Sequence, residues 1–417
     1  MEKDRVGGMC LNWGCIPTKS LLESVKLLER VRQAAQFGVD GIDEGKLSFN
    51  WANARARAQR VVKRLTGGVA SLLARNGVDV IAGEATLASS TRVRVAGRLL
   101  EADHIFIATG SRPAPLRLPI PPEMILEIEP LLTGDSAPRQ VVLVGQGPNA
   151  VELAQLLKLA GGVVTLLVPG GELLPQADPY LSRYALGRLA KDGVNVRLET
   201  VPTGHFENGI LVGSEKIFCD KVLNVSAREA VIPASEIELE RERGFLRTDE
   251  YLRTNRPTVF AIGDVNGRSE LAHAASAQGL YAVNAVKGIR WKINLAHCPL
   301  NIYTLPEMAQ VGLTEPEIQA RGLDYKVSEF PLAANGKAVC EGATEGFVRL
   351  LSEKRYGEVL GVQIVAAHAT DMIAEAAALL QMEGTIFDLT KVIHAHPTVS
   401  EIFMEAGYAA VDQAIHV

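Results

Sequence analysis

Cys10 and Cys15 are separated by four residues and lie where a glycine-containing loop is expected to enter a helix. Pro17 suits the first helical position, and apolar residues recur at helical spacing after it, namely Leu21, Leu22, Val25, Leu28 and Val31. A thiolate on Cys15 would be stabilised by the positive end of this helix, and Lys19 adds a cation one turn further on. The arrangement predicts a redox-active disulfide. The alternative is a pair of small buried residues that never react.

The composition excludes several classes of protein. The chain has 417 residues, of which 47% are apolar, and this length suggests roughly two to four domains. Its net charge is only −5, and we expect Lys and Arg to be mixed with Asp and Glu, without a basic stripe. Neither a nucleic acid nor an anionic membrane is therefore an expected partner.

The location is expected to be cytoplasmic. The first residues lack the apolar segment of a signal peptide, and no apolar run reaches the roughly 18 residues of a spanning helix. The 5 cysteines form one close pair and three singles, Cys219, Cys298 and Cys340, unlike the dense frameworks of secreted domains. No metal site is predicted.

A dinucleotide-binding turn is predicted in the middle of the chain. Gly145 and Gly147 would let the backbone approach phosphates, and Ala150 is small enough for close packing of helix on strand. The flanking pattern is a strand, a helix and a second strand, at residues 140–144, 151–160 and 163–168. Such a turn also occurs as a plain connector, but the flanking strands favour nucleotide binding.

The remaining pattern indicates a second nucleotide-binding domain and a different terminal domain. Residues 103–110 can be laid over residues 220–227, a faint internal duplication. Earlier strand-like runs are expected at 78–81, 91–95 and 104–107, and another ends at Gly263-Asp264. From about residue 296 the pattern is α+β, with strands near 309–311, 327–330, 347–351 and 359–365 and helices at 370–383 and 401–413.

His396 and Glu401 form a candidate proton-transfer pair. A carboxylate that holds one ring nitrogen fixes the histidine tautomer and raises its basicity. The alternative is that His394 and His396 are surface residues before a helix capped by Ser400.

Several motifs together resemble one family. In chain order they are CLNWGC (10–15), ATGSRP (108–113), Gly263-Asp264 with LAH (271–273), YTLPEMAQVGLTE (303–315), FPLAANGKA (330–338) and HPTVSE (396–401). They resemble the flavin-dependent pyridine nucleotide-disulfide oxidoreductases, and among them the dihydrolipoamide dehydrogenases. The resemblance implies an α/β fold with an FAD domain at 1–118 and 246–295, an NAD(P) domain at 119–245 and an α+β dimerisation domain at 296–417. It also implies a homodimer and, as a partner, a 2-oxo acid dehydrogenase complex.

The resemblance also implies residue roles. Cys10 would exchange with a dihydrolipoyl dithiol, Cys15 would face the flavin, and His396 with Glu401 would act as the base across the dimer interface. FAD would be bound by Glu2, Lys19, Thr109, Gly110, Ser111, Arg112, Gly263, Asp264, Leu271, Ala272 and His273. The nicotinamide nucleotide would be bound by Gly145, Gly147 and Ala150, with Glu152 near both rings.

The sequence departs from the family pattern in the nucleotide sites. Val168 stands where an acid for the ribose of NAD is usual, and Ala227 stands where a glycine is usual, so NADP is not excluded. Two further functions stay open. One is a related reductase of another disulfide, and the other is a non-catalytic paralogue that serves as a binding or scaffold subunit.

Flavin binding by residues 1–417 is predicted to be weak or absent. A strand, GxGxxG turn, helix and second strand would precede Glu2 in the family, so the FAD domain is expected to be incomplete at its amino end, with central strands lost and apolar faces exposed. Gel filtration of the purified 417-residue chain tests this. Stoichiometric flavin in the protein peak would contradict it.

Overall fold

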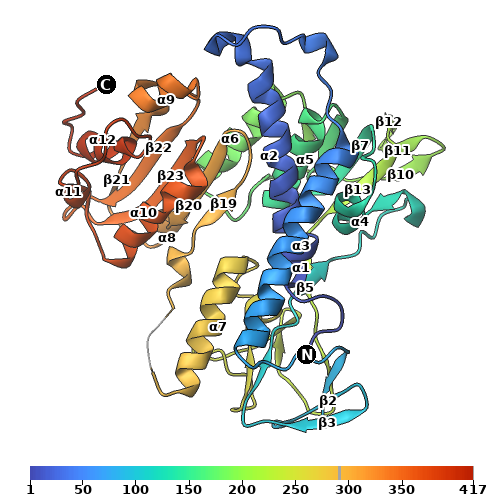
Figure 1. The fold of residues 1–417 in the computed structure, drawn as a ribbon. Helices are drawn as coiled ribbons and strands as arrows, with labels where there is room; N and C mark the ends of the chain where they lie inside the picture. The colour runs from blue at the N-terminus through green and yellow to red at the C-terminus, as the bar shows by residue number, and fades with distance from the viewer. Residues whose placement is uncertain (290–292, 417) are drawn as a thin grey trace. The chain divides into compact units, whose positions relative to one another are not determined.

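The computed structural model describes residues 1–289 and 293–416. The chain divides into two compact units, each made of separate stretches of sequence (Figure 1). The first unit comprises residues 1–24, 48–138 and 220–295, and the second comprises residues 25–47, 139–219 and 296–417. Among the described helices, none combines the length and the hydropathy that a membrane span requires.

The first unit is a mixed α/β assembly. Its helices are α1 (Gly8–Asn12), the first part of α2 (Cys15–Arg32), α3 (Trp51–Arg75), α4 (Ile128–Thr133) and α7 (Ala272–Val286). Its strands are β1 (Ala85–Leu87), β2 (Arg92–Val95), β3 (Arg98–Glu101), β4 (Ile105–Ile107), β5 (Ser111–Pro113), β6 (Ile125–Leu126), β13 (Lys221–Val225), β14 (Arg228–Ala230), β15 (Ala234–Ser235), β16 (Arg241–Glu242), β17 (Phe245–Leu246) and β18 (Val259–Ala261). Strands β15, β1, β2 and β3 form one sheet in that order, and Leu87, Ile107, Leu246 and Val259 pack in one core beneath them.

The two copies of the internal duplication continue into strands that pair with each other. Strand β5 follows the first copy, strand β14 follows the second, and they pair antiparallel with Ser111 opposite Ala230 and Pro113 opposite Arg228. Gly110 accepts a hydrogen bond from the Val231 amide at 2.9 Å. Ser111 directly follows the first copy and Arg228 directly follows the second. The pairing of β5 with β14 therefore places these two equivalent positions on neighbouring strands.

Among the described residues, strand β4 has a hydrogen-bonded neighbour on one side. It pairs in parallel with β18, where the Ile105 amide donates to Thr258 and the Ile262 amide donates to Ile107. In a parallel ladder alternate residues bond to opposite sides, so the backbone of Phe106 faces the edge at which the described residues contain no strand.

The strand expected at 78–81 is not formed. Only a single bridge is present, between Glu2 and Ala82, supported by hydrogen bonds from the Glu2 amide to Ile81 and from the Gly83 amide to Glu2. Val78 and Val80 are each about half exposed, at 48% and 49%. A β-prone run needs a hydrogen-bonded neighbour over several residues to become a strand, whereas among the described residues the bridge is at Ala82, just after this run.

The second unit contains a parallel sheet, a small meander and a large antiparallel sheet. Its helices are the rest of α2, α5 (Pro148–Leu159), α6 (Pro179–Lys191), α8 (Glu315–Ala320), α9 (Gly336–Glu341), α10 (Ala369–Gln381), α11 (Ile386–Leu389) and α12 (Glu401–Ala410). Its strands are β7 (Gln140–Gly145), β8 (Val163–Leu167), β9 (Asn195–Arg197), β10 (Gly204–Phe206), β11 (Gly209–Val212), β12 (Glu215–Phe218), β19 (Leu300–Ile302), β20 (Glu307–Gly312), β21 (Tyr325–Pro331), β22 (Phe347–Glu353) and β23 (Val359–Ala366). Strands β7, β8 and β9 are parallel neighbours, whereas β10 to β12 are antiparallel.

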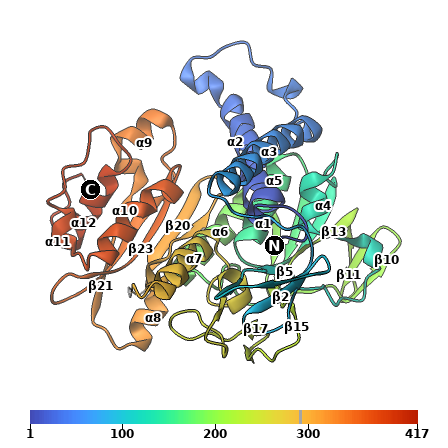
Figure 2. The same ribbon diagram turned by 60° about the horizontal axis from the view of Figure 1, so that its bottom comes forward.

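The antiparallel sheet has the order β19-β20-β23-β22-β21 (Figure 1), and Figure 2 shows helices α10 and α12 beside its strands. Helices α10 and α12 pack against one face of it, where alternate residues such as Val348, Leu350, Val362 and Ile364 join a buried core with Phe403. The strands and helices expected after residue 296 are thus present, with boundaries shifted by a few residues. The predicted α/β class with a carboxyl-terminal α+β domain is confirmed.

The opposite face of the antiparallel sheet holds a buried ionic network. The Arg349 guanidinium contacts Gln363 Oε1 at 3.1 Å, Glu315 Oε2 at 2.5 Å and Asp178 Oδ1 at 3.8 Å. Asp178 is 1% exposed, and its side chain also accepts hydrogen bonds from the backbone amides of Tyr180 and Glu315. Charges buried this deeply are tolerated because each has partners.

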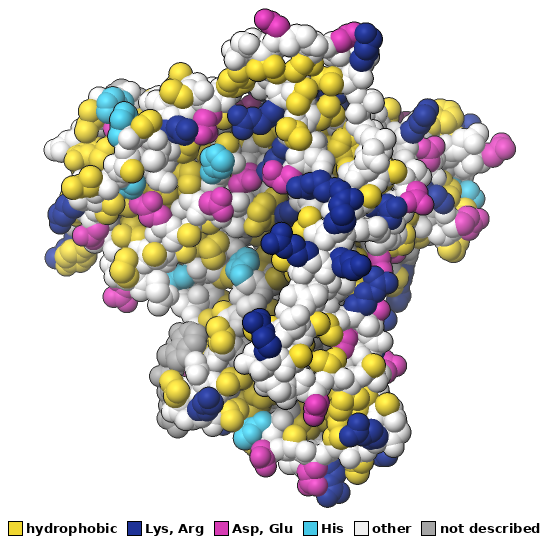
Figure 3. Space-filling view, in the orientation of Figure 1, with side chains coloured by type: hydrophobic (Ala, Val, Ile, Leu, Met, Phe, Trp, Pro, Cys, Tyr) yellow, Lys and Arg dark blue, Asp and Glu magenta, His cyan; other side chains and the backbone are white. Residues whose placement is uncertain are grey.

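One helix departs from the even mixture of charges that the sequence suggested. Helix α3 contains no acidic residue, and its basic residues are Arg55, Arg57, Arg60, Lys63, Arg64 and Arg75. Figure 3 shows dark blue side chains gathered over the region of α3 in Figure 1. Within the first unit two of these cations have partners, because Arg55 pairs with Asp135 and Arg57 donates to the Ser20 carbonyl. The expectation that no basic stripe forms is therefore wrong for this helix.

Gly346→Ala is predicted to destabilise the second unit strongly. Gly346 has a φ of +138°, and a Cβ placed on it would lie 1.9 Å from the Val365 carbonyl oxygen. We expect the free energy of unfolding to fall by about 2–4 kcal/mol in denaturant titrations. Gly336→Ala is the matched control, since a Cβ there meets nothing within 4 Å, and it should change stability by less than about 0.5 kcal/mol. Equal stabilities for the two variants would contradict the prediction.

Candidate active site

The two cysteines lie on either side of a tight connection between two helices. Cys10 is in α1, and Cys15 is the first residue of α2. The Trp13 amide donates to the Met9 carbonyl at 2.9 Å, and a Cβ placed on Gly14 would lie 3.1 Å from that carbonyl oxygen. Helix α2 begins two residues earlier than predicted, because Pro17 occupies the first turn, where the missing N–H needs no intrahelical partner.

The two thiols interact directly. A hydrogen bond with the Cys15 side chain is the main cause that raises the pKa of Cys10, followed by burial and by the charge of Cys15. The positive charge of Lys19 acts in the opposite direction. Cys10 therefore keeps its proton while Cys15 accepts it as a hydrogen bond, at the positive end of an 18-residue helix.

A buried arginine organises the groups near Cys15. Arg228 Nε donates to Ser111 Oγ at 2.7 Å, and its Nη2 donates to the Ser111 carbonyl at 2.7 Å. Ser111 Oγ donates in turn to Asp264 Oδ2, and the Arg228 guanidinium lies 3.9 Å from the same carboxylate oxygen. Ser111 and Asp264, both predicted site residues, are thus brought together by Arg228.

The charges of this cluster influence one another. Burial lowers the pKa of Arg228, while the negative charges of Asp264, Glu270 and Cys15 oppose that change. Burial also raises the pKa of Glu270, and the charge of Asp264 adds to the effect. One buried cation is therefore shared among two carboxylates and a thiol.

The carboxylate of Asp264 fits a ligand that carries hydroxyl groups. Gly263, with a φ of +71°, turns the chain after β18, and its amide donates to Gln278 Oε1 at 2.8 Å. Gln278 is fully buried, and its Nε2 has no partner among the described residues. The polar groups around Asp264 suit the ribityl side of a flavin.

The other predicted flavin residues lie in the same unit. Thr109 Oγ1 donates to the Val231 carbonyl, Gly110 has a φ of +68°, and Arg112 is paired with Glu229 at 2.6 Å. Leu271 is the N-cap residue of α7, and the helix begins with Ala272 and His273. Glu2 forms the bridge to Ala82, and its carboxylate accepts a hydrogen bond from the Asp4 amide at 2.9 Å.

The predicted dinucleotide turn has the expected geometry. Gly145 ends β7, Gly147 is the N-cap residue of α5 with a φ of +89°, and Ala150 is fully buried. Glu152, expected near both rings, is buried in the second unit. It is 1% exposed and accepts a hydrogen bond from the Tyr303 amide at 3.0 Å, because α5 packs against the segment before β20.

His396 and Glu401 form a hydrogen-bonded pair. His396 Nδ1 lies 2.9 Å from Glu401 Oε1, while Glu401 Oε2 accepts the Thr398 amide at 2.8 Å. Burial alone would raise the pKa of Glu401, but the hydrogen bonds from Thr398 and His396 outweigh it and the pKa is lowered. The cap expected from Ser400 is absent, because its backbone is already helical and its side chain makes no capping bond. The His396 side chain is 79% exposed, so the ring is open to a partner.

His394 is a second histidine with a carboxylate partner, but its surroundings differ. Its Nε2 lies 2.8 Å from Glu375 Oε1, and the side chain is only 5% exposed. Its Nδ1 is buried without a partner among the described residues. The surface interpretation of His394 is therefore wrong, and the pair anchors the chain two residues before His396.

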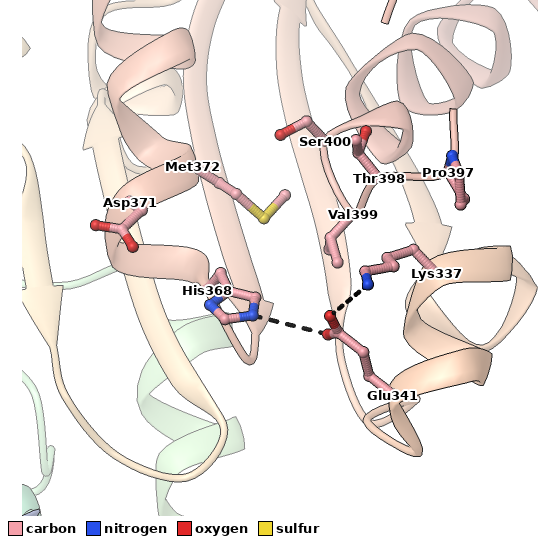
Figure 4. A pocket seen from close by; sticks show the side chains of 9 residues that line it. All are labelled: Lys337, Glu341, His368, Asp371, Met372, Pro397, Thr398, Val399 and Ser400. Carbon is pink, nitrogen blue, oxygen red and sulfur yellow. Dashed lines mark ion pairs between the residues drawn. The ribbon is translucent and has the colours of Figure 1, made fainter. Parts of the chain in front are cut away.

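A cavity of about 390 Å³ opens beside the residues that follow His396 (Figure 4). It is lined by Lys337, Glu341, His368, Asp371, Met372 and residues 397–400. Glu341 pairs with Lys337 at 3.1 Å and with His368 at 3.7 Å. Most of the charged side chains that line the cavity are therefore balanced by one another. The cavity has no concentrated charge that would select a ligand.

Sequence reasoning missed Arg228, Glu270 and the Glu375 partner of His394. Arg228 carried a usable signal, because it follows the second copy of the duplication just as Ser111 follows the first. Glu375 is 19 positions from His394, and no local pattern indicates that pairing.

Comparison with known proteins identifies relatives along nearly the whole chain. Residues 2–279 match the family described as pyridine nucleotide-disulphide oxidoreductase, and residues 298–407 match the dimerisation domain of that family. A dihydrolipoyl dehydrogenase of Bacillus subtilis is 34% identical, over 100% of this chain and 94% of the relative. A dihydrolipoyl dehydrogenase of Thermus scotoductus is 35% identical, over 100% and 93%.

Solved structures have the same fold. LpdA from Mycobacterium tuberculosis matches with a TM-score of 0.88 and 25% identity, over 97% of this chain and 92% of that one. The HOCl-induced flavoprotein disulfide reductase RclA from Escherichia coli matches with a TM-score of 0.82 and 23% identity, over 96% and 92%, which shows the fold alone.

Cys15→Ala is predicted to lower the pKa of Cys10. The substitution removes the hydrogen bond and the charge that hold the proton on Cys10, so its thiolate should form at lower pH. Alkylation of Cys10 by iodoacetamide in the reduced protein, mapped by peptide mass spectrometry across a pH series, measures this. The alkylation profile should move to lower pH in Cys15→Ala and stay in place in the control Cys340→Ala. An unmoved profile in Cys15→Ala would show that the two thiols are not coupled.

Proposed function

The chain belongs to the pyridine nucleotide-disulphide oxidoreductase family, and from this premise we propose that it oxidises a dihydrolipoyl dithiol with NAD⁺. The observation that carries the proposal is the direct interaction of the Cys10 and Cys15 thiols at the start of α2. Members of this family use FAD and a nicotinamide nucleotide. The proposed reaction is thus a two-electron disulfide exchange coupled to a nucleotide.

The exchange itself involves only sulfur atoms of this chain and the substrate. One thiolate of the dithiol attacks Sγ of Cys10 in the Cys10–Cys15 disulfide, and Cys15 leaves as a thiolate. The second substrate thiolate then attacks the mixed disulfide, which releases the substrate as a disulfide and leaves Cys10 reduced. The substrate loses two electrons and two protons, and the cysteine pair gains the two electrons.

The environment of the two cysteines suits this order of events. Cys15 lies at the helix terminus and close enough to Arg228 for their charges to interact, so it is the better leaving thiolate. Cys10 holds its proton more tightly and is the residue that returns to the thiol. FAD, when bound, would supply two-electron redox chemistry between Cys15 and the nicotinamide nucleotide.

We assign proton transfer to His396. Glu401 holds its Nδ1, which leaves Nε2 to accept a proton from a substrate thiol. The ring is highly exposed in its own chain, and Ile393 nearby is 97% exposed, as expected of residues covered by a second subunit. The proposal is therefore a homodimer in which each subunit supplies His396 to the other's cysteines. We further propose that the substrate is a dihydrolipoyl group carried by a 2-oxo acid dehydrogenase complex, and that the reaction takes place in the cytoplasm.

Reduction of NAD⁺ and NADP⁺ by dihydrolipoamide, measured with added FAD, tests the proposed function. We expect turnover that disappears in Cys10→Ser and Cys15→Ser. Turnover with another dithiol but not with dihydrolipoamide would favour the related reductase. Absence of turnover with flavin bound would favour the binding or scaffold subunit.

His396→Gln is predicted to lower kcat by about 10²- to 10⁴-fold, because the variant loses the proton acceptor. His416→Gln is the matched control, since His416 Nδ1 lies 2.7 Å from Glu405 Oε1 and its side chain is also exposed, at 65%. This control should retain the kcat of the parent protein. Equal losses in both variants would mean that the effect is structural and that His396 is not the base.

A further inference from the structure

The position expected to recognise the adenosine ribose cannot do so in this chain. Val168, which directly follows β8, has an apolar side chain that is fully buried. Its backbone is occupied as well, because its amide donates to the Arg197 carbonyl at 2.9 Å and its carbonyl accepts the Thr200 amide at 2.9 Å. In a dinucleotide-binding fold a carboxylate is needed at this edge to bind the ribose hydroxyls.

Another carboxylate reaches the same edge from the neighbouring strand. Glu199 follows β9, and its amide donates to the Gly170 carbonyl at 3.0 Å, which ties it to the segment just after β8. A Cβ placed on Gly171 would lie 3.9 Å from Glu199 Oε1, so the carboxylate is beside the backbone of that glycine. Since β8 and β9 are parallel, both positions lie at the carboxyl end of the sheet.

The backbone of Glu199 is strained. Its φ is +51°, in the left-handed region that costs a residue with a Cβ about 1 kcal/mol or more relative to glycine. The side chain is exposed, and across residues 1–289 and 293–416 the structure gives its carboxylate no hydrogen bond or ion pair. The Glu199 amide is bonded to Gly170, but no hydrogen bond or ion pair of its side chain with the described residues offsets the strain, so the carboxylate is available to a ligand.

From these observations we infer that Glu199 is the residue that binds the adenosine ribose of the nicotinamide nucleotide and selects NAD over NADP. This inference rests on the proposed function, because it assumes that the turn at Gly145–Gly147 binds such a nucleotide. The turn leads into α5, and the side chain of Gln146 lies against Gly170, since a Cβ placed there would be 2.9 Å from Gln146 Oε1. Gln146, Gly170 and Glu199 thus border one edge of the parallel strands, where dinucleotides bind.

The charges at this edge explain the selectivity. A carboxylate accepts hydrogen bonds from the two ribose hydroxyls but repels the charge of a 2′-phosphate. Arg197 is the nearest cation in sequence, and Glu215 holds it with two hydrogen bonds of 2.6 and 2.7 Å. It is therefore already neutralised and is not available to a phosphate.

The test measures binding of two nucleotide fragments, ADP-ribose and its 2′-phosphate, to the full chain by calorimetry. Binding of either fragment can be measured without bound flavin and without enzyme turnover. The parent protein should prefer ADP-ribose, and Glu199→Gln should weaken ADP-ribose binding by about 10- to 100-fold without weakening binding of the 2′-phosphate. Glu172→Gln is the matched control, because Glu172 is an exposed acid in the segment after β8, next to Gly171, and this variant should bind both fragments as the parent does.

A further variant separates binding from folding. Glu199→Gly removes the strained Cβ, so it should raise Tm while losing the same affinity as Glu199→Gln. Parental affinity in Glu199→Gln, or loss in Glu172→Gln instead, would overturn the assignment and leave the proposed function intact. A parent protein that binds neither fragment and reduces neither nucleotide would overturn both.

Discussion

The guanidinium of Arg228 is the interaction on which the candidate redox site depends. It holds Ser111 through two hydrogen bonds, and through Ser111 it fixes the carboxylate of Asp264. Its charge also balances Glu270 and acts on Cys15. Without it the negative charges of Asp264 and Glu270 would repel each other with no nearby cation to balance them, and ionisation of both would be less favourable. Strand pairing between β5 and β14 puts the arginine in place, so the internal duplication and the electrostatics of the site have one origin.

Much of the fold could be predicted from the sequence where the signal is local. The alternating and apolar strands after residue 296, the glycine turn before α5 and the helix after Cys15 all follow from periodicity and turn residues. Residues 78–81 have the composition of a strand, but the described residues place no strand beside them. Composition alone cannot predict whether a run will have a strand to pair with. The basic character of α3 could not be predicted from the net charge of the whole chain, because acidic residues elsewhere cancel its positive charges.

The candidate site was predictable only in part, for the same reason. Cys10, Cys15, His396 and Glu401 belong to short motifs whose members are close in sequence. Arg228 with Asp264, His394 with Glu375, and Glu199 with Gly171 are long-range pairs that only the folded chain brings together. Two histidine–glutamate pairs of the terminal domain show how strongly the surroundings decide what such a pair can do. His394 is enclosed and structural, whereas the similar His396 pair is open and suited to chemistry.

At one side of β4 the described residues place no strand, so the backbone amide and carbonyl of Phe106 have no strand beside them. The strand is short and parallel to β18, and the Phe106 ring stacks on Phe260. Such an edge can add a further strand from the same polypeptide or from another, and backbone hydrogen bonding alone does not distinguish the two.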